Sequence, residues 1–82
     1  MSIYEYNGKK NICGPRIKEA RKMRKITQTE LAAKMQIHGI ILDQFSISRI
    51  EAGTRFITDF ELWMFSKILN VDMEWLLLGD SK

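Results

Sequence analysis

The sequence predicts an all-α fold, a compact domain of five short helices. Apolar side chains recur at helical spacing in five segments that show no internal repeat. Thr27 with Glu30, and Thr58 with Glu61, have the spacing of a capping box at a helix start. The length of 82 residues leaves room for one domain only.

The first residues differ from the rest of the chain. They contain Asn, Gly and Lys without helical periodicity, so we interpret residues 1–13 as a flexible N-terminal arm. Residues 14–82 then form the folded domain, and Cys13 at its border is expected to be a small, semi-buried apolar residue rather than a reactive thiol.

The first two helices should each bury one face. Pro15 suits the first turn of a helix, where its missing N–H costs no hydrogen bond. Thr27 caps the second helix. The inner positions are Ile17, Ala20 and Arg24 in the first helix, and Leu31, Ala32, Met35 and Ile37 in the second.

The third helix is short and has a bare outer face. Asp43 is a suitable N-cap, and Gly53 stands where a left-handed C-cap residue belongs. At about 100° per residue, Ile47 and Ile50 point inward together. The opposite side carries Phe45, Ser48, Arg49 and Ala52.

The fourth and fifth helices suggest a partner. The fourth runs from its Thr58 cap to about Leu69, and Asp72 caps the fifth, which Gly79 closes. The fourth helix has an inner face and a second apolar stripe opposite, which would be buried by another copy of the chain. The inner face is Leu62, Phe65, Ser66 and Leu69, and the dimer interface predicted for a two-fold homodimer is Phe60, Trp63, Met64, Ile68, Trp75 and Leu78. Alternatively, residues 1–13, with Tyr4 and Tyr6, fold back over this stripe and keep the protein monomeric.

Composition excludes several classes of function. Cys13 is the single cysteine and His38 the single histidine, so the sequence holds no metal-ligand spacing and no internal disulfide. No set of paired carboxylates or nucleophile and base indicates an enzyme, and no cofactor is expected. No apolar run reaches the roughly 18 residues of a membrane span, and the N-terminus lacks a signal-peptide core, so we expect a cytoplasmic protein.

Charge is distributed unevenly along the chain. Residues 1–50 hold ten Lys or Arg against four acids, whereas residues 51–82 hold three against six. A basic half suits a polyanion such as DNA. The alternative is a solvated surface with a chance asymmetry.

Three strings then carry a family resemblance: RIKEARKMRKITQTELAAKM, SISRIEAGTR and TDFELWMFSKILNVDMEWLL. In this order and spacing the chain resembles the helix-turn-helix domain of phage-repressor and Cro/Xre-type transcriptional regulators, over residues 14 to 79. The resemblance implies a lambda-repressor-like DNA-binding domain whose helix-turn-helix covers residues 27–53. It also implies an ion pair between Arg21 and Glu51 that fixes the third helix against the first.

The candidate DNA contacts follow from residue chemistry and from the resemblance. Gln28, at the start of the second helix, can donate to a phosphate oxygen, and Thr54 and Arg55 lie just past the third helix, where phosphates are expected. The outer face of the third helix would contact base edges in the major groove. The predicted base-reading residues are Gln44, Phe45, Ser48 and Arg49, with Phe45 suited to a thymine methyl group.

The turn of the motif departs from the family. It is about five residues longer than the common version, at His38-Gly39-Ile40-Ile41-Leu42. We expect Ile40 or Leu42 to tuck between the second and third helices, and His38 to lie at the surface or near a phosphate. A short β-like excursion over IILDQFSI is the alternative.

The sequence therefore predicts a protein that binds double-stranded DNA in a sequence-specific manner and regulates transcription, by resemblance as a repressor. A homodimer would bind a near-palindromic operator. The alternative is a protein-interaction module of antitoxin or adaptor type built on the same fold.

Overall fold

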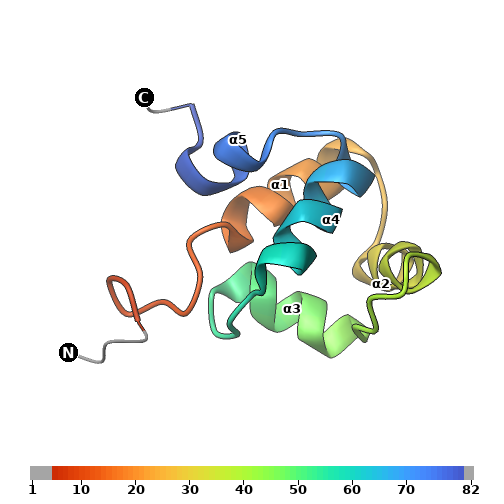
Figure 1. Ribbon diagram of the computed structural model, residues 1–82, viewed down its shortest axis with the longest axis horizontal. Helices are drawn as coiled ribbons and strands as arrows, with labels where there is room; N and C mark the ends of the chain where they lie inside the picture. Colours follow the sequence, from red (N-terminus) through yellow and green to blue (C-terminus); the bar gives the residue numbers. More distant parts are fainter. Residues whose placement is uncertain (1–4, 81–82) are drawn as a thin grey trace.

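The computed structural model describes residues 5–80, and this range contains five α-helices and no strand, which confirms the all-α prediction. In Figure 1, α2 and α3 lie together on one side of the α1 and α4 pair, and α5 lies on the other. A turn that pairs Tyr6 with Lys9 precedes the helices. The helices are α1 (Gly14–Met23), α2 (Gln28–Ile37), α3 (Gln44–Ala52), α4 (Asp59–Leu69) and α5 (Met73–Leu78).

Side-chain caps fix the starts of α2, α3 and α4, as the sequence predicts. At α2, the Glu30 amide donates to Thr27 Oγ1 at 3.0 Å, and the Glu30 carboxylate accepts from the Thr27 amide at 2.8 Å. The same box forms at α4 between Thr58 and Glu61. At α3, Asp43 Oδ1 accepts from the backbone N–H three residues on, at 2.7 Å. Each cap satisfies a donor that the first helical turn leaves without an intrahelical partner.

The ends of α4 and α5 depend on arginines of α1. Asp72 stands at the N-cap position of α5, but its side chain makes no capping bond, contrary to expectation. The six-residue helix is instead held at its other end, where Arg16 donates to the carbonyls of Leu76 at 2.8 Å and Leu77 at 2.7 Å. Arg24 was expected on the inner face of α1, but it is exposed and caps α4 by donating to Leu69 O at 2.9 Å.

One apolar core joins all five helices. The predicted inner residues of α1, α2 and α3 are buried, apart from Arg24 and Ile37. Ile37 is 79% exposed, because it lies about 200° around the helix from Met35 and so faces solvent. The core consists of Cys13, Ile17, Ala20, Leu31, Ala32, Met35, Leu42, Ile47, Ile50, Met64, Phe65, Leu69 and Leu76.

The lengthened turn packs as expected between α2 and α3. Leu42 is buried in the core, and Ile40 packs against it half-buried. Ile41 and His38 are exposed. The β-like alternative is wrong, because the Asp43 cap starts α3 immediately after the turn.

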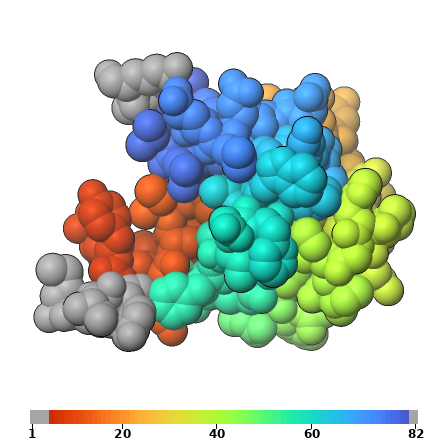
Figure 2. Space-filling view, viewed as in Figure 1, coloured from red at the N-terminus to blue at the C-terminus, as the bar shows by residue number. Residues whose placement is uncertain are grey.

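The two opposed stripes predicted for α4 are not present. Met64 belongs to the core and is therefore not available to a second copy, whereas Ile68 packs against the core half-buried. Helices α1, α2 and α5 all contact α4, and together they bury a wide arc of its surface. The exposed residues of α4 are Asp59, Phe60, Trp63 and Lys67. The Lys67 ammonium lies 5.5 Å from the Trp63 ring centre. The α4 side chains, in teal to cyan, stand at the centre of the face in Figure 2.

The flexible-arm interpretation is wrong for the residues just before α1. Asn11 is buried, and its amide nitrogen donates to the carbonyls of Ile50 at 3.0 Å and Arg55 at 2.8 Å. Its amide oxygen accepts from the Gly14 amide at 2.8 Å. This part of the segment therefore docks on the end of α3. Residues 1–4, including Tyr4 of the monomer alternative, lie outside the described residues, and Tyr6 is exposed.

Candidate nucleic-acid interface

The outer face of α3 is a polar and aromatic surface held on a rigid base. Ile47 and Ile50 are fully buried and anchor the helix. Phe45 is 66% exposed, and Gln44 and Arg49 are also exposed. Ser48 is half-buried. The structure thus brings the four predicted base-reading residues together on one helix.

A bidentate ion pair fixes α3 against α1. Arg21 Nε lies 2.7 Å from Glu51 Oε2, and Arg21 Nη2 donates to Glu51 Oε1 at 3.1 Å. The side chains are 11% and 3% exposed. The hydrogen bond to Glu51 raises the pKa of Arg21 above its ordinary value, against a smaller opposing effect of burial. The pair predicted from the resemblance is present, and its Arg21 also donates to Ile26 O at 2.9 Å.

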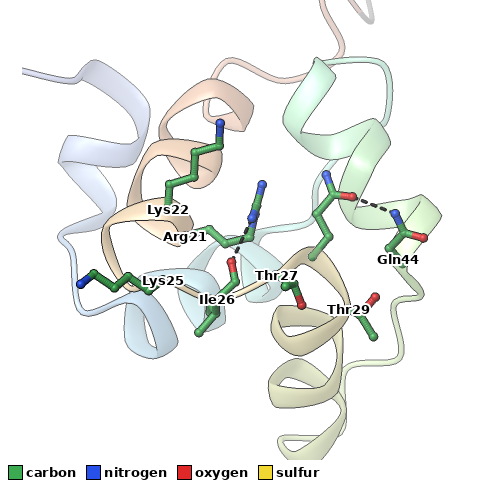
Figure 3. Close-up of a pocket in the computed structure, with 8 residues that line it drawn as sticks. Arg21, Lys22, Lys25, Ile26, Thr27, Thr29 and Gln44 are labelled. Carbon is green, nitrogen blue, oxygen red and sulfur yellow. Dashed lines mark hydrogen bonds between the residues drawn. The ribbon is translucent and has the colours of Figure 1, made fainter.

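A chain of side-chain amides connects this ion pair to the outer face of α3. Gln28 Nε2 donates to Glu51 Oε1 at 3.0 Å, and Gln28 Oε1 accepts from Gln44 Nε2 at 2.9 Å. Figure 3 shows the second of these bonds, running from α3 to the start of α2. The nitrogen and the oxygen of the Gln28 amide are therefore both engaged in hydrogen bonds, and the second bond holds Gln44. Gln28 itself is the first residue of α2, the position for which the sequence predicts a phosphate contact.

A shallow depression of about 510 Å³ opens beside this chain of amides. It lies where the end of α1 meets the start of α2, as Figure 3 shows. Lys22 and Lys25 line it, are exposed, and were not among the site residues predicted from sequence. The sequence shows that both residues are charged, but helical periodicity does not show that they lie close to α3. The lining residues are Arg21, Lys22, Lys25, Ile26, Thr27, Gln28, Thr29 and Gln44.

Of the two predicted site residues after α3, Thr54 is exposed and Arg55 is half-buried. Thr54 is exposed and its hydroxyl donates to Arg49 O at 3.3 Å. The Arg55 guanidinium is engaged inside the protein, because it pairs with the buried Glu61 at 3.2 Å and donates to Phe56 O at 2.8 Å. A phosphate contact by Arg55 would compete with these bonds.

The sequence has a single thiol, that of Cys13. Cys13 is almost completely buried, more deeply than expected, and burial raises the pKa of its thiol to about 11. No group of three or more His, Cys, Asp or Glu within residues 5–80 could hold a metal ion. Within the same range, no helix is both long and apolar enough to cross a membrane.

Comparison with known proteins gives two findings. Residues 17–76 match the helix-turn-helix protein family. The fold is similar to the crystal structure of the P22 c2 repressor in complex with a synthetic operator, with a TM-score of 0.67 and 31% sequence identity. That likeness covers 85% of this chain and 98% of the repressor chain. No curated protein matches significantly. The chain belongs to the phage-repressor and Xre-type family of helix-turn-helix transcriptional regulators.

Proposed function

We propose that this protein binds double-stranded DNA in a sequence-specific manner and represses transcription, with α3 in the major groove. The observation that carries the proposal is the exposed outer face of α3, fixed from behind by the Arg21–Glu51 pair and by Gln28. Major-groove recognition needs a rigid helix with free hydrogen-bonding and apolar groups on its outer side. The P22 c2 repressor, which is similar in fold, was crystallised with a synthetic operator.

Three side chains of α3 would make the main base contacts. The forked guanidinium of Arg49 suits a guanine edge, and the Gln44 amide suits an adenine edge. The exposed ring of Phe45 can contact a thymine methyl group. Ser48 would approach the same edges from the half-buried side of the helix.

Phosphate contacts would lie at both ends of the motif. Gln28 and the exposed Lys22 and Lys25 border the depression at the start of α2, where amides and lysines favour an anion. Thr54 occupies the other end. We expect Arg55 to contribute less to phosphate binding, because its guanidinium already pairs with Glu61.

A two-fold homodimer is part of the same proposal. Phe60, Trp63 and Leu78 are exposed, and Ile68 and Trp75 are half-buried. These side chains leave an apolar surface on the C-terminal helices, from which the buried Met64 is absent. Two copies would place their reading helices about one turn of DNA apart on a near-palindromic operator. The proposal includes a cytoplasmic location and a binding role without catalysis. Nothing in residues 5–80 favours an antitoxin or adaptor module over this function.

Selection of bound duplexes from a random pool tests the function. We expect one enriched site with two related half-sites. Arg49→Ala should relax the preference at one base position in each half-site, at a cost of about 1–3 kcal/mol for that position. Lys34→Ala removes an exposed positive charge from α2 and should leave the preference unchanged. A pool that emerges without any enriched sequence would rule out sequence-specific binding.

A further inference from the structure

We infer that the N-terminal segment of residues 5–13 is a second DNA-binding element, which holds Lys9 and Lys10 against the phosphate backbone beside the C-terminal end of α3. This inference rests on the proposed function, since it concerns the same DNA. The segment lies outside residues 17–76, which match the helix-turn-helix family.

The segment is fastened to the end of the reading helix. The Lys10 amide donates to Gly53 O at 2.8 Å, and Asn11 donates to the carbonyls of Ile50 and Arg55. These carbonyls belong to the last turn of α3 and the loop after it, where a helix leaves acceptors unpaired. The Tyr6–Lys9 turn precedes this contact, and Tyr6, Asn7 and Lys9 line a depression together with Ala52 and Gly53 at the end of α3.

Lys9 lies directly across the end of α3. Its Nζ is 3.4 Å from Ala52 O, and its stem would be 2.9 Å from a Cβ placed on Gly53. Gly53 has φ of +80°, a left-handed conformation that favours glycine in this turn. The ammonium has three donors, and one of them reaches Ala52, the last residue of α3. The side chain is otherwise exposed.

Lys10 is held on the neighbouring side by an aromatic ring. Its ammonium lies 5.4 Å from the centre of the Phe56 ring, in the loop between α3 and α4. Such a contact orients a cation without neutralising it. Glu5 is the acid in the described part of the segment, so the two lysines leave it with net positive charge.

At the C-terminal end of α3, the cation that the loop after the helix supplies is already engaged within the protein. Arg55 follows α3, but its guanidinium pairs with Glu61 and bonds to Phe56 O. Lys9 and Lys10 supply exposed cations at the same end of the motif. With Lys22 and Lys25 at the start of α2, positive charge then flanks α3 at both ends.

The test is the salt dependence of DNA affinity in the full chain. Fluorescence anisotropy with a duplex carrying the enriched site gives log K against log salt concentration for the parent and for Lys9→Met/Lys10→Met. Methionine keeps an unbranched side chain of similar length. It removes both ammonium groups, and with them the Lys9 bond to Ala52 O and the Lys10 contact with the Phe56 ring. Each lost phosphate contact should flatten the slope by about 0.9, so the double variant should lose about 1.8 per bound protomer. Lys9→Arg/Lys10→Arg should restore the parent slope.

Three outcomes decide between the possibilities. The matched control is Lys34→Met, which removes an exposed cation from α2 outside both the segment and the dimer surface, and it should leave the slope unchanged. A double variant with the parent slope overturns the inference, and so does a control that flattens the slope equally, because net charge would then be responsible. If the parent itself enriches no site, the proposed function fails instead.

Discussion

At the scale of single residues, the Arg21–Glu51 pair both stabilises the fold and supports the outer face of α3. It is deeply buried, and it anchors the residue that orients Gln44. Arg21→Ala would leave the Glu51 carboxylate buried without its charged partner, so the free energy of unfolding should fall by roughly 3–5 kcal/mol. Urea unfolding followed by circular dichroism measures this loss. An unchanged unfolding midpoint would show that the pair does not stabilise the fold.

Gln28 should affect specificity as well as affinity. Gln28→Ala removes the acceptor that holds the Gln44 amide, so we expect weaker binding overall and a relaxed preference at the base that Gln44 contacts. Selection from a random pool measures both effects. Gln36→Ala, at an exposed position of the same helix, serves as the control. Weaker binding with an unchanged preference would mean that Gln28 acts on phosphate alone.

The sequence predicted which residues share a helix face, but it did not predict all of their hydrogen-bond and ion-pair partners. The four base-reading candidates lie together, because helical spacing alone places them on one face. Arg55 shows the limit, since its charge looked available but a carboxylate six residues later engages it. The docking of Asn11 on α3 depends on contacts some 40 residues apart, which no local pattern reveals.

At the scale of elements, the start of α3 should depend on pH. The Ser46 amide donates to Asp43, which lowers the pKa of that carboxyl below its usual value. The folded state then binds fewer protons than the unfolded state in acid, so the cap stabilises the fold above the unfolded pKa. This contribution is lost as pH falls through the lowered, folded-state pKa.

Asp43→Asn tests this dependence, because asparagine also caps helices but does not titrate. Melting temperatures of the parent and the variant, recorded from about pH 5 down to about pH 2.5, should differ in slope, with the parent losing more stability. Parallel curves would show that the carboxylate of Asp43 contributes nothing beyond a neutral cap.

Helix α5 should depend on Arg16. A helix of six residues is too short to be stable alone, and Arg16 donates to the carbonyls of Leu76 and Leu77. We expect Arg16→Ala to lower stability by about 1–2 kcal/mol, since the side chain is only half-buried. Hydrogen exchange should accelerate in residues 76–79 and not in α2. Unchanged exchange there would contradict this role.

Element boundaries were largely predictable because capping side chains act locally. Thr27, Asp43 and Thr58 mark their helices in the sequence and in the structure. The buried arc of α4 was not predictable, because its width depends on how many helices surround it. Met64 was therefore assigned to a partner surface, although the core of the same chain buries it.

At the scale of the whole molecule, self-association can be separated from DNA binding. We expect the parent to sediment as a dimer on the order of tens of micromolar, and Trp63→Glu to sediment as a monomer because it introduces charge into an apolar surface. Phe45→Glu changes a still more exposed aromatic on α3 and should remain dimeric. A monomeric parent at that concentration would remove the dimer from the proposal.

The hydrogen-bonded connection from Arg21 through Glu51 and Gln28 to Gln44 has a consequence for how this protein diverges. A change at Gln44 removes the hydrogen bond that it donates to Gln28, whereas no side-chain hydrogen bond within residues 5–80 restrains Phe45 or Arg49. Paralogues with new operators would then arise by drift at the unrestrained positions, while the restrained glutamine keeps one base of every half-site in common.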